Sequence, residues 1–163
     1  SPSKTFNVAA LHAATVIVPN ANLRAQVSRG LNSEELAEPN LMAIPGTIAA
    51  YEDGALWLDR VLATIQANRQ LVNDFVQEQL AGWVTVVPGE ATYLLWLDVS
   101  KLTNDSTKLA AFIRKQTGLI LSAGAIYGGN GKSFLRMNVA CSDKTVLTGL
   151  DRLARGITEW QNQ

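Results

Sequence analysis

One lysine near the start of the sequence has neighbours that suit it to bind an anionic ligand. Lys4 stands in the segment Ser-Pro-Ser-Lys-Thr-Phe-Asn, with hydroxyl side chains at Ser1, Ser3 and Thr5. A lysine amine becomes a nucleophile when it loses its proton, and hydroxyl groups can donate hydrogen bonds to a phosphate. The segment is therefore either half of a covalent binding site or an ordinary solvated lysine, and these seven residues leave both interpretations open.

A second candidate group lies far along the chain, in Ser-Phe-Leu-Arg-Met-Asn-Val-Ala, residues 133–140. Strand alternation assigns its residues to two faces, Leu135, Met137 and Val139 to one and Phe134, Arg136 and Asn138 to the other. The guanidinium of Arg136 is a rigid fork of donors that matches a carboxylate. This second face is either a solvated surface, which periodicity alone favours, or a clamp for a carboxylate ligand.

Other residues that could carry chemistry give weaker indications. The loop 123–132 holds four glycines and Asn130 around Tyr127, which permits close backbone approach to a ligand. Its glycine spacing is not that of a nucleotide-binding motif, so by itself it reads as a long hairpin connection. His12 and Cys141 are each the sole residue of their type and have no catalytic partner at a known spacing. We therefore expect a structural histidine, a buried thiol and no metal site.

The composition is that of a globular protein of 163 residues with 47% apolar residues and no formal net charge. This balance gives no basic field to attract nucleic acid or an anionic membrane, and no apolar run is long enough to cross a bilayer. A single cysteine excludes an internal disulfide and fits a reducing compartment. We expect a cytoplasmic protein without nucleic-acid or membrane partners.

The first half of the chain is expected to be mostly helical. The β-branched run 14–18 predicts a strand, and a helix should follow through about Arg29 and stop at Gly30. Two prolines make residues 32–47 a connector, with helix resuming after Pro45. Apolar residues then recur at steps of three and four from about residue 53 to residue 80, which predicts one long helix. Arg69 interrupts its apolar stripe and is expected to keep its charge in water.

After Gly82 the pattern changes to alternating short strands and helices. The predicted order is strand, strand, helix, strand, strand, helix, in the ranges 83–87, 92–99, 106–117, 119–121, 133–140 and 143–160. Gly118 should end the first of these helices, and Asp143 should cap the second, whose apolar stripe is Val146, Leu147, Leu150, Leu153 and Ile157. The expected layer is a small, largely antiparallel sheet covered by helices.

Five segments together resemble one family. Residues 1–11, 53–72, 91–100, the glycine loop and residues 134–142 resemble, in order and spacing, the fold-type I pyridoxal-phosphate-dependent aminotransferases, and within them the branch of cystathionine β-lyase and cystalysin-like C–S lyases. The resemblance covers nearly the whole chain. It implies an α/β class protein, comprising the C-terminal part of the transferase fold with an α+β small domain.

The resemblance also implies roles for single residues. Lys4 matches the lysine that forms the Schiff base, or aldimine, with pyridoxal 5'-phosphate and then moves the substrate α-proton. Ser1, and more weakly Ser3, matches a hydroxyl that binds the cofactor phosphate. Arg136 matches the arginine that binds the substrate α-carboxylate, which reverses the interpretation of its strand face, and Tyr127 lies in a loop that borders the active site in the family.

Two positions depart from the family pattern. Many members have an arginine phosphate ligand eight residues after the lysine, where this chain has His12, and often a proline where it has Ala123. The acidic partner of the pyridine nitrogen, the stacked aromatic residue and the main phosphate cradle precede the lysine in the family. The chain is therefore expected to be a C-terminal fragment that is nearly inactive alone.

The resemblance divides the chain into three expected parts. Residues 1–50 would be the tail of the large cofactor-binding domain, residues 51–82 the bridging helix and residues 83–163 the small domain. The expected function is transamination or C–S lyase chemistry on an amino acid, in a homodimer. The alternative is a small-domain module that binds a ligand or partner chain without catalysis.

Overall fold

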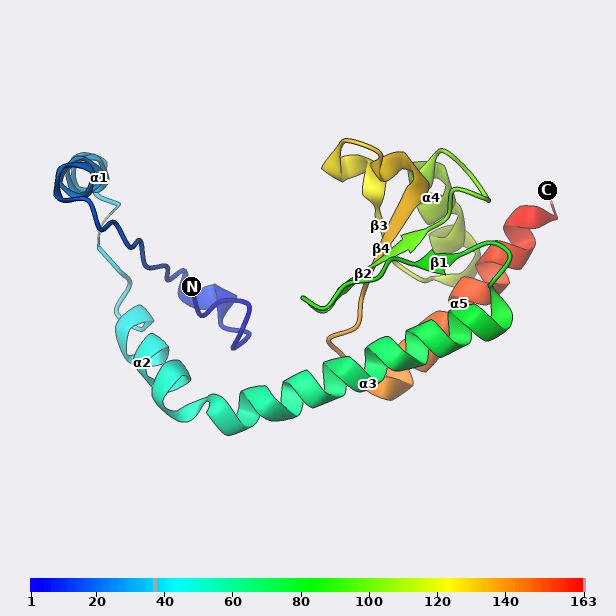
Figure 1. Ribbon diagram of the computed structural model, residues 1–163, viewed down its shortest axis with the longest axis horizontal. Helices are drawn as coiled ribbons and strands as arrows, with labels where there is room; N and C mark the ends of the chain where they lie inside the picture. Colours follow the sequence, from blue (N-terminus) through cyan, green and yellow to red (C-terminus); the bar gives the residue numbers. More distant parts are fainter. Residues whose placement is uncertain (37, 163) are drawn as a thin grey trace. The chain divides into compact units, whose positions relative to one another are not determined.

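The computed structural model describes residues 1–36 and 38–162, which fall into two compact units, Ser1–Arg60 and Val61–Gln163. Figure 1 shows their elements along the chain. None of the helices in the described part of the chain is both long and apolar enough to cross a membrane. Each unit has its own internal contacts and is described by itself.

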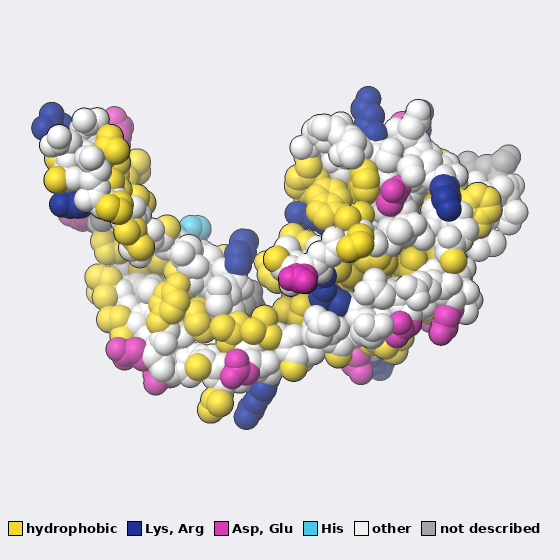
Figure 2. Space-filling model, in the orientation of Figure 1, with side chains coloured by type: hydrophobic (Ala, Val, Ile, Leu, Met, Phe, Trp, Pro, Cys, Tyr) yellow, Lys and Arg dark blue, Asp and Glu magenta, His cyan; other side chains and the backbone are white. Residues whose placement is uncertain are grey.

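The first unit is built from short helices with almost no buried core. It contains a 3-10 helix η1 (Ala9–Leu11) and the helices α1 (Ala21–Ser33) and α2 (Ala43–Asp53). Of its described residues only Pro2 and Ala43 are buried. Apolar side chains are instead exposed along α1 and α2, as the yellow surface in Figure 2 shows, among them Leu23, Val27, Ile44, Ile48 and Tyr51.

The structure corrects three expectations for this unit. Residues 14–18 form no strand, because the four strands that pair in the described residues all lie between Thr85 and Asn138. Helix α1 continues past Gly30, which meets no steric or capping demand there. Helix α2 begins before Pro45, since a proline in the first helical turn removes an N–H that would have no partner within the helix. The predicted connector includes residue 37, which lies outside the described residues.

The predicted long helix is confirmed as α3 (Ala55–Gln79), which continues into the second unit. Its stripe is buried only toward the C-terminal end, at Val72 and Val76, whereas Leu62 is 53% exposed. Arg69 is half-buried and does more than keep its charge in water. Its guanidinium donates exposed hydrogen bonds to the carbonyl oxygens of Gly89, Ala91 and Thr92, so it also binds the loop between the first two strands of the sheet.

Four antiparallel strands form the sheet of the second unit, in the order β1-β2-β4-β3. Their bounds are Thr85–Val86 for β1, Leu94–Asp98 for β2, Ser122–Ala123 for β3 and Phe134–Asn138 for β4. The predicted strand at 119–121 is displaced to Ser122–Ala123, because these residues pair with Arg136 and Leu135. The predicted order of strands and helices is confirmed.

The strands alternate as predicted. Leu135 and Met137 of β4 point into the core together with Leu95 and Leu97 of β2, while Arg136 lies on the opposite face. The core face packs with α3 and with the helices α4 (Ser106–Thr117) and α5 (Asp143–Gln161), and the fully buried residues among them include Val72, Leu109, Ile113, Val146, Leu150, Leu153 and Ile157. These side chains form a single buried core against one face of the sheet.

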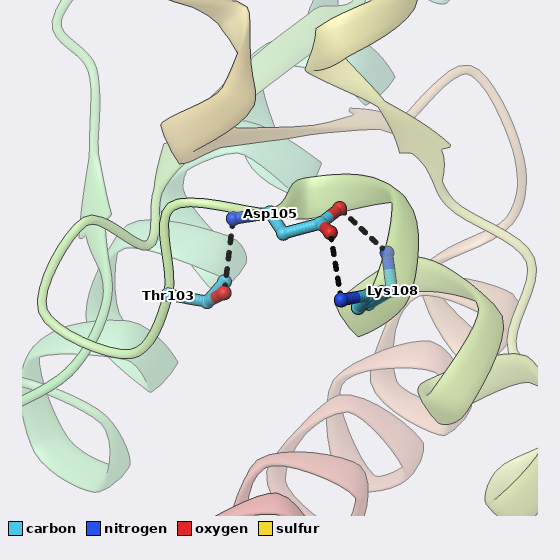
Figure 3. A network of polar contacts seen from close by, with 3 residues as sticks. All are labelled: Thr103, Asp105 and Lys108. Carbon is cyan, nitrogen blue, oxygen red and sulfur yellow. Dashed lines mark hydrogen bonds and ion pairs between the residues drawn. The ribbon is translucent and has the colours of Figure 1, made fainter.

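Both helices that cover the sheet have defined ends. At the start of α4 the carboxylate of Asp105 accepts a hydrogen bond from the backbone N–H of Lys108 at 3.1 Å and lies 3.5 Å from its ammonium group (Figure 3). Gly118 ends α4 in the left-handed conformation, as predicted. Helix α5 is capped by Ser142 instead of Asp143, whose carboxylate lies in the first turn. Leu147 is 46% exposed and is not part of the buried stripe.

Candidate functional site

Lys4 lies in a tight turn whose backbone closes around it. The N–H of Phe6 donates to the carbonyl oxygen of Pro2 at 3.0 Å, and the N–H of Val8 donates to that of Ser3 at 3.1 Å. The Lys4 side chain is exposed, and no carboxylate of the described residues pairs with it. The amine is therefore available to a ligand, and the turn that carries it is held by its own hydrogen bonds.

The two serines beside Lys4 share one small hydrogen-bond network. The Ser1 hydroxyl donates to the carbonyl oxygen of Ala13 at 2.8 Å, and its oxygen accepts from the N–H of Ser3 at 3.2 Å. Because the single Ser1 hydroxyl proton is used by Ala13, the 2.7 Å contact between the hydroxyls has Ser3 as its donor. The Ser3 hydroxyl donates only to another exposed hydroxyl. It can therefore turn its proton toward a phosphate oxygen without leaving a buried group unpaired.

Phe6 fixes the Lys4 turn to the junction between α2 and α3. Its ring lies edge-on to Tyr51 at 5.3 Å between centroids and 6.4 Å from the ring of Trp57. It also covers Gly54, where an added Cβ would clash with the Phe6 ring and with the carbonyl oxygen of Ala50. The position of Lys4 therefore depends on a glycine fifty residues later in the chain.

His12 has no place in this network. It is an exposed residue at the end of η1, in the left-handed conformation with φ of 50°, and its backbone N–H donates to the carbonyl oxygen of Ala9. This conformation is uncommon for a residue with a Cβ. The imidazole is thus a surface group in the described unit.

In the second unit, Arg136 lies at the middle of the sheet, on the face opposite the core. The strand register places it directly between Ser122 of β3 and Trp96 of β2. Its guanidinium Nη2 donates a hydrogen bond to the Ser122 hydroxyl at 3.3 Å, and it pairs with no carboxylate of the described residues. A half-buried arginine with most of its donors unused can bind an incoming carboxylate in two-pronged fashion.

Tyr127 lies directly against this guanidinium. The central carbon of the Arg136 guanidinium is 4.7 Å from the centre of the Tyr127 ring, which is a cation–π contact. The same ring meets Trp96 edge-on, with centroids 5.4 Å apart and planes at 83°. The structure therefore brings the predicted substrate-binding residues Arg136 and Tyr127 together.

The glycine loop that carries Tyr127 is closed by backbone contacts and is not a simple hairpin connection. Its two 3-10 turns, η2 (Gly124–Tyr127) and η3 (Gly131–Ser133), approach each other so closely that a Cβ on Gly124 or Gly131 would overlap the other turn's backbone. The buried Ser106 hydroxyl donates to the carbonyl oxygen of Gly131 and accepts from the N–H of Ala125, both at 3.2 Å. These glycines serve packing within the loop.

Sequence reasoning missed three residues of this arrangement. Trp96, Ser122 and Ser106 give no motif of their own. The alternation in residues 92–99 was a usable signal for Trp96, because it places this residue on the face opposite the core residues Leu95 and Leu97. Its neighbour across the sheet follows only from the register, which the sequence does not specify. The predicted site residues thus form two groups, Ser1, Ser3 and Lys4 in the first unit and Tyr127 and Arg136 in the second.

Comparisons with known proteins show what the whole chain is similar to. The scan against protein-family models gave no match. The chain is 34% identical over 97% of its length to cystathionine β-lyase PatB of Bacillus subtilis, and 31% identical over 96% to the protein MalY of Escherichia coli. It covers 41% and 40% of these relatives, so it spans about two fifths of the length of the curated proteins that it matches.

Solved structures also match this chain over nearly its whole length and over about two fifths of their own. The pyridoxal-phosphate-bound C–S lyase from Staphylococcus hominis matches 98% of this chain with a TM-score of 0.86 and 27% identity, and the match covers 41% of that lyase. The helices and the small antiparallel sheet therefore have the arrangement found in the C-terminal region of that fold.

Proposed function

Because this chain belongs to the cystathionine β-lyase branch of the pyridoxal-phosphate-dependent aminotransferases and C–S lyases, we propose that it supplies the lysine and the carboxylate-binding arginine of such an enzyme. The substrate is an amino acid, and the reaction is either transamination or β-elimination that breaks a C–S bond. The observation that carries the proposal is the unpaired Arg136 guanidinium held on Tyr127, in a chain that also has an unpaired Lys4. Residues 1–50, 51–82 and 83–163 would be the large-domain tail, the bridging helix and the small domain.

The residues around Lys4 fit pyridoxal phosphate. The cofactor offers an aldehyde and a phosphate, and the turn offers an exposed amine beside the hydroxyls of Ser1 and Ser3. Lys4 would hold the aldehyde group, and the Ser3 hydroxyl, with that of Ser1, would hold the phosphate. His12 occupies the position of a family phosphate ligand, but its surface location gives no support for that role. When bound, the cofactor stores the electrons that a substrate Cα leaves behind on losing its proton.

Each protein residue then has a defined task. The Lys4 amine accepts the proton from the substrate Cα, for which it must be in its neutral form. Arg136 binds the substrate α-carboxylate through its fork of N–H donors and so fixes which bond at Cα faces the base. The face of the Tyr127 ring excludes water from one side of the guanidinium, since the ring contacts that group directly.

Covalent capture tests the role of Lys4. The full chain is mixed with pyridoxal phosphate, reduced with borohydride and mapped by peptide mass spectrometry. The label should be found on Lys4 and should disappear in Lys4→Ala, while Lys101→Ala, which removes another exposed lysine, should label as the wild type does. Equal labelling of the surface lysines, or labelling unaffected by Lys4→Ala, would contradict the proposed function.

One observation favours a second candidate function, a binding module without catalysis. All sixteen residues of the buried apolar cluster, from Val72 to Ile157, lie in the second unit, which also contains the whole sheet and Arg136. Calorimetric titration of the full chain with amino acids separates the two functions. Binding that is lost in Arg136→Lys but unchanged in Lys4→Ala, together with no labelling of Lys4, would support the module.

We further propose that the protein acts as a homodimer and resides in the cytoplasm. Support for the dimer is the exposed apolar surface of α1 and α2 in a unit with only two buried described residues. Sedimentation equilibrium of the full chain tests this proposal, and a concentration-independent mass of one chain would contradict it.

A further inference from the structure

An arginine that binds a carboxylate must be held in one orientation before its ligand arrives. The side chain has several rotatable bonds, and fixing them costs conformational entropy. Whatever holds the guanidinium in the free protein therefore contributes directly to affinity. The contacts that hold Arg136 before a carboxylate arrives therefore affect how tightly the carboxylate binds.

The backbone positions only the base of this side chain. Ser122, Arg136 and Trp96 are direct neighbours across three strands, so strand pairing on both sides fixes the Cα of Arg136. The guanidinium, at the far end, has a single 3.3 Å hydrogen bond to the Ser122 hydroxyl. A single bond of this length leaves the plane of the guanidinium free to turn about it.

The guanidinium also contacts the Tyr127 ring, and Tyr127 itself needs support. The Tyr127 side chain is 48% exposed and lies at the end of a 3-10 turn that is followed by Gly128 and Gly129, both with positive φ. A half-exposed ring beside two glycines would otherwise change rotamer freely.

Trp96 gives that support. Its ring meets Tyr127 at 5.4 Å and 83°, and it also meets Phe134 at 6.2 Å and 87°. Edge-to-face contacts of this kind stabilise a pair of aromatic rings beyond the effect of burying their surface. Trp96 and Phe134 both stand on paired strands, so the indole is a rigid support that connects the sheet to Tyr127.

We propose that Trp96 is a positioning residue for Arg136. It holds the Tyr127 ring against the guanidinium, and through that ring it orients the donors that bind a carboxylate. This inference deepens the proposed function, on which it rests for the identity of the ligand. The selectivity of the site for a carboxylate over a neutral group then depends on Trp96, a residue that takes no part in the chemistry.

The first test needs no ligand. The Nε–H group of Arg136 is bonded to the central guanidinium carbon, which lies 4.7 Å from the centre of the Tyr127 ring. Its proton should therefore show a ring-current displacement in the proton–nitrogen NMR spectrum, with Arg136→Lys identifying the signal. Trp96→Leu should abolish the displacement, and Trp96→Phe, which keeps a smaller aromatic edge, should give an intermediate value. Trp83→Leu is the matched control, because Trp83 is 44% exposed and makes no ring contact within the described residues.

An unchanged displacement in a folded Trp96→Leu protein would overturn the proposal. Should that variant fail to fold, Trp96→Phe decides alone, and a value equal to that of the wild type would equally overturn it. Tyr127→Phe should keep the displacement and Tyr127→Leu should lose it, since the ring and not the hydroxyl makes the contact.

The second test measures selectivity. The full chain is titrated with L-alanine and with L-alaninamide, which differ only in the carboxylate. Trp96→Leu should weaken L-alanine binding by about 10-fold while L-alaninamide binding stays the same, and Trp83→Leu should change neither. Equal weakening of both ligands would indicate general damage and would contradict a positioning role.

The two tests separate the proposals. Wild-type protein that binds L-alanine no better than L-alaninamide would contradict the assigned role of Arg136, and the role of Trp96 would then be decided by the NMR displacement alone. A displacement that depends on Trp96, with carboxylate selectivity that does not, would overturn the inference while leaving the proposed function in place.

Discussion

The side-chain amide of Asn68 donates a hydrogen bond to the carbonyl oxygen of Val139 at 2.9 Å, across 71 residues of sequence. A second bond from the same nitrogen reaches the carbonyl oxygen of Cys141 at 2.8 Å. Asn68 is 1% exposed and lies on α3, so one buried amide connects this helix to the segment that leaves the strand of Arg136. Buried carbonyl groups without a donor are costly, which gives this pair of bonds structural importance.

Replacing Asn68 by alanine should therefore destabilise the protein. The substitution leaves two carbonyl oxygens without their donor and opens a small cavity, at a cost of about 2–4 kcal/mol. Urea denaturation followed by far-ultraviolet circular dichroism measures the change. Gln77→Ala on the exposed side of the same helix is the control and should change the free energy of unfolding by less than about 0.5 kcal/mol. Equal effects of the two variants would show that the Asn68 contacts carry no net stability.

Two glycines of α5 should respond differently to alanine. A Cβ on Gly156 would lie 3.0 Å from Cγ1 of the fully buried Ile113, whereas on Gly149 it would meet Met137 at an ordinary 3.6 Å. Gly156→Ala should cost about 1–3 kcal/mol through overpacking between α4 and α5. Gly149→Ala should be neutral or stabilising by up to about 1 kcal/mol, because alanine favours the helix. Thermal unfolding of both variants checks this, and the reverse order would contradict the packing.

The cap of α4 predicts a dependence of stability on pH. A hydrogen bond from the backbone N–H of Lys108, aided by the Lys108 charge and opposed by partial burial, lowers the pKa of Asp105 below its ordinary 3.8. A carboxylate with a lowered pKa in the folded state stabilises the protein above its ordinary pKa, and this contribution is lost as the pH falls through the folded-state value. Asp105→Asn, which can still cap the helix, should be less stable than the wild type at pH 6.

The difference between Asp105→Asn and the wild type should shrink as the pH is lowered, because Asp105 takes up its proton as the pH falls through its lowered folded-state pKa. Denaturation curves at several pH values measure it. The exposed Asp59→Asn serves as the control for a general change of net charge. A difference that does not vary with pH would show that the Asp105 charge has no part in stability.

The two units should differ in local stability. Helix α1 has no buried residue and α2 has one, Ala43. Hydrogen exchange of their backbone amides should therefore be at least about 100-fold faster than in α4 and α5. Exchange followed by mass spectrometry of peptides from the full chain measures this. Equal protection in α1 and α5 would show that the apolar surface of the first unit is covered in solution.

The sequence predicts those features of the structure that a local residue pattern determines. It does not predict those that depend on pairing between distant segments. The alternation through Leu135, Arg136 and Met137 was correct because two residues per repeat is a property of any strand. The β-branched run 14–18 failed because strand propensity has no effect without a partner strand. The site followed the same rule. Arg136 was found from its residue type, whereas Trp96 acts through Tyr127, a contact between distant segments that no spacing reveals.

The approach of Gly124 to Gly131 has a consequence for how the loop can vary. An added Cβ at either position overlaps the backbone of the other, and backbone cannot be made smaller by a change elsewhere. No second-site substitution can therefore rescue a first one, so the two positions are fixed independently and not as a coevolving pair. In a library with the loop randomised and selected for folding, both should return as glycine, while Gly128 and Gly129, which have open space around them, should also admit asparagine.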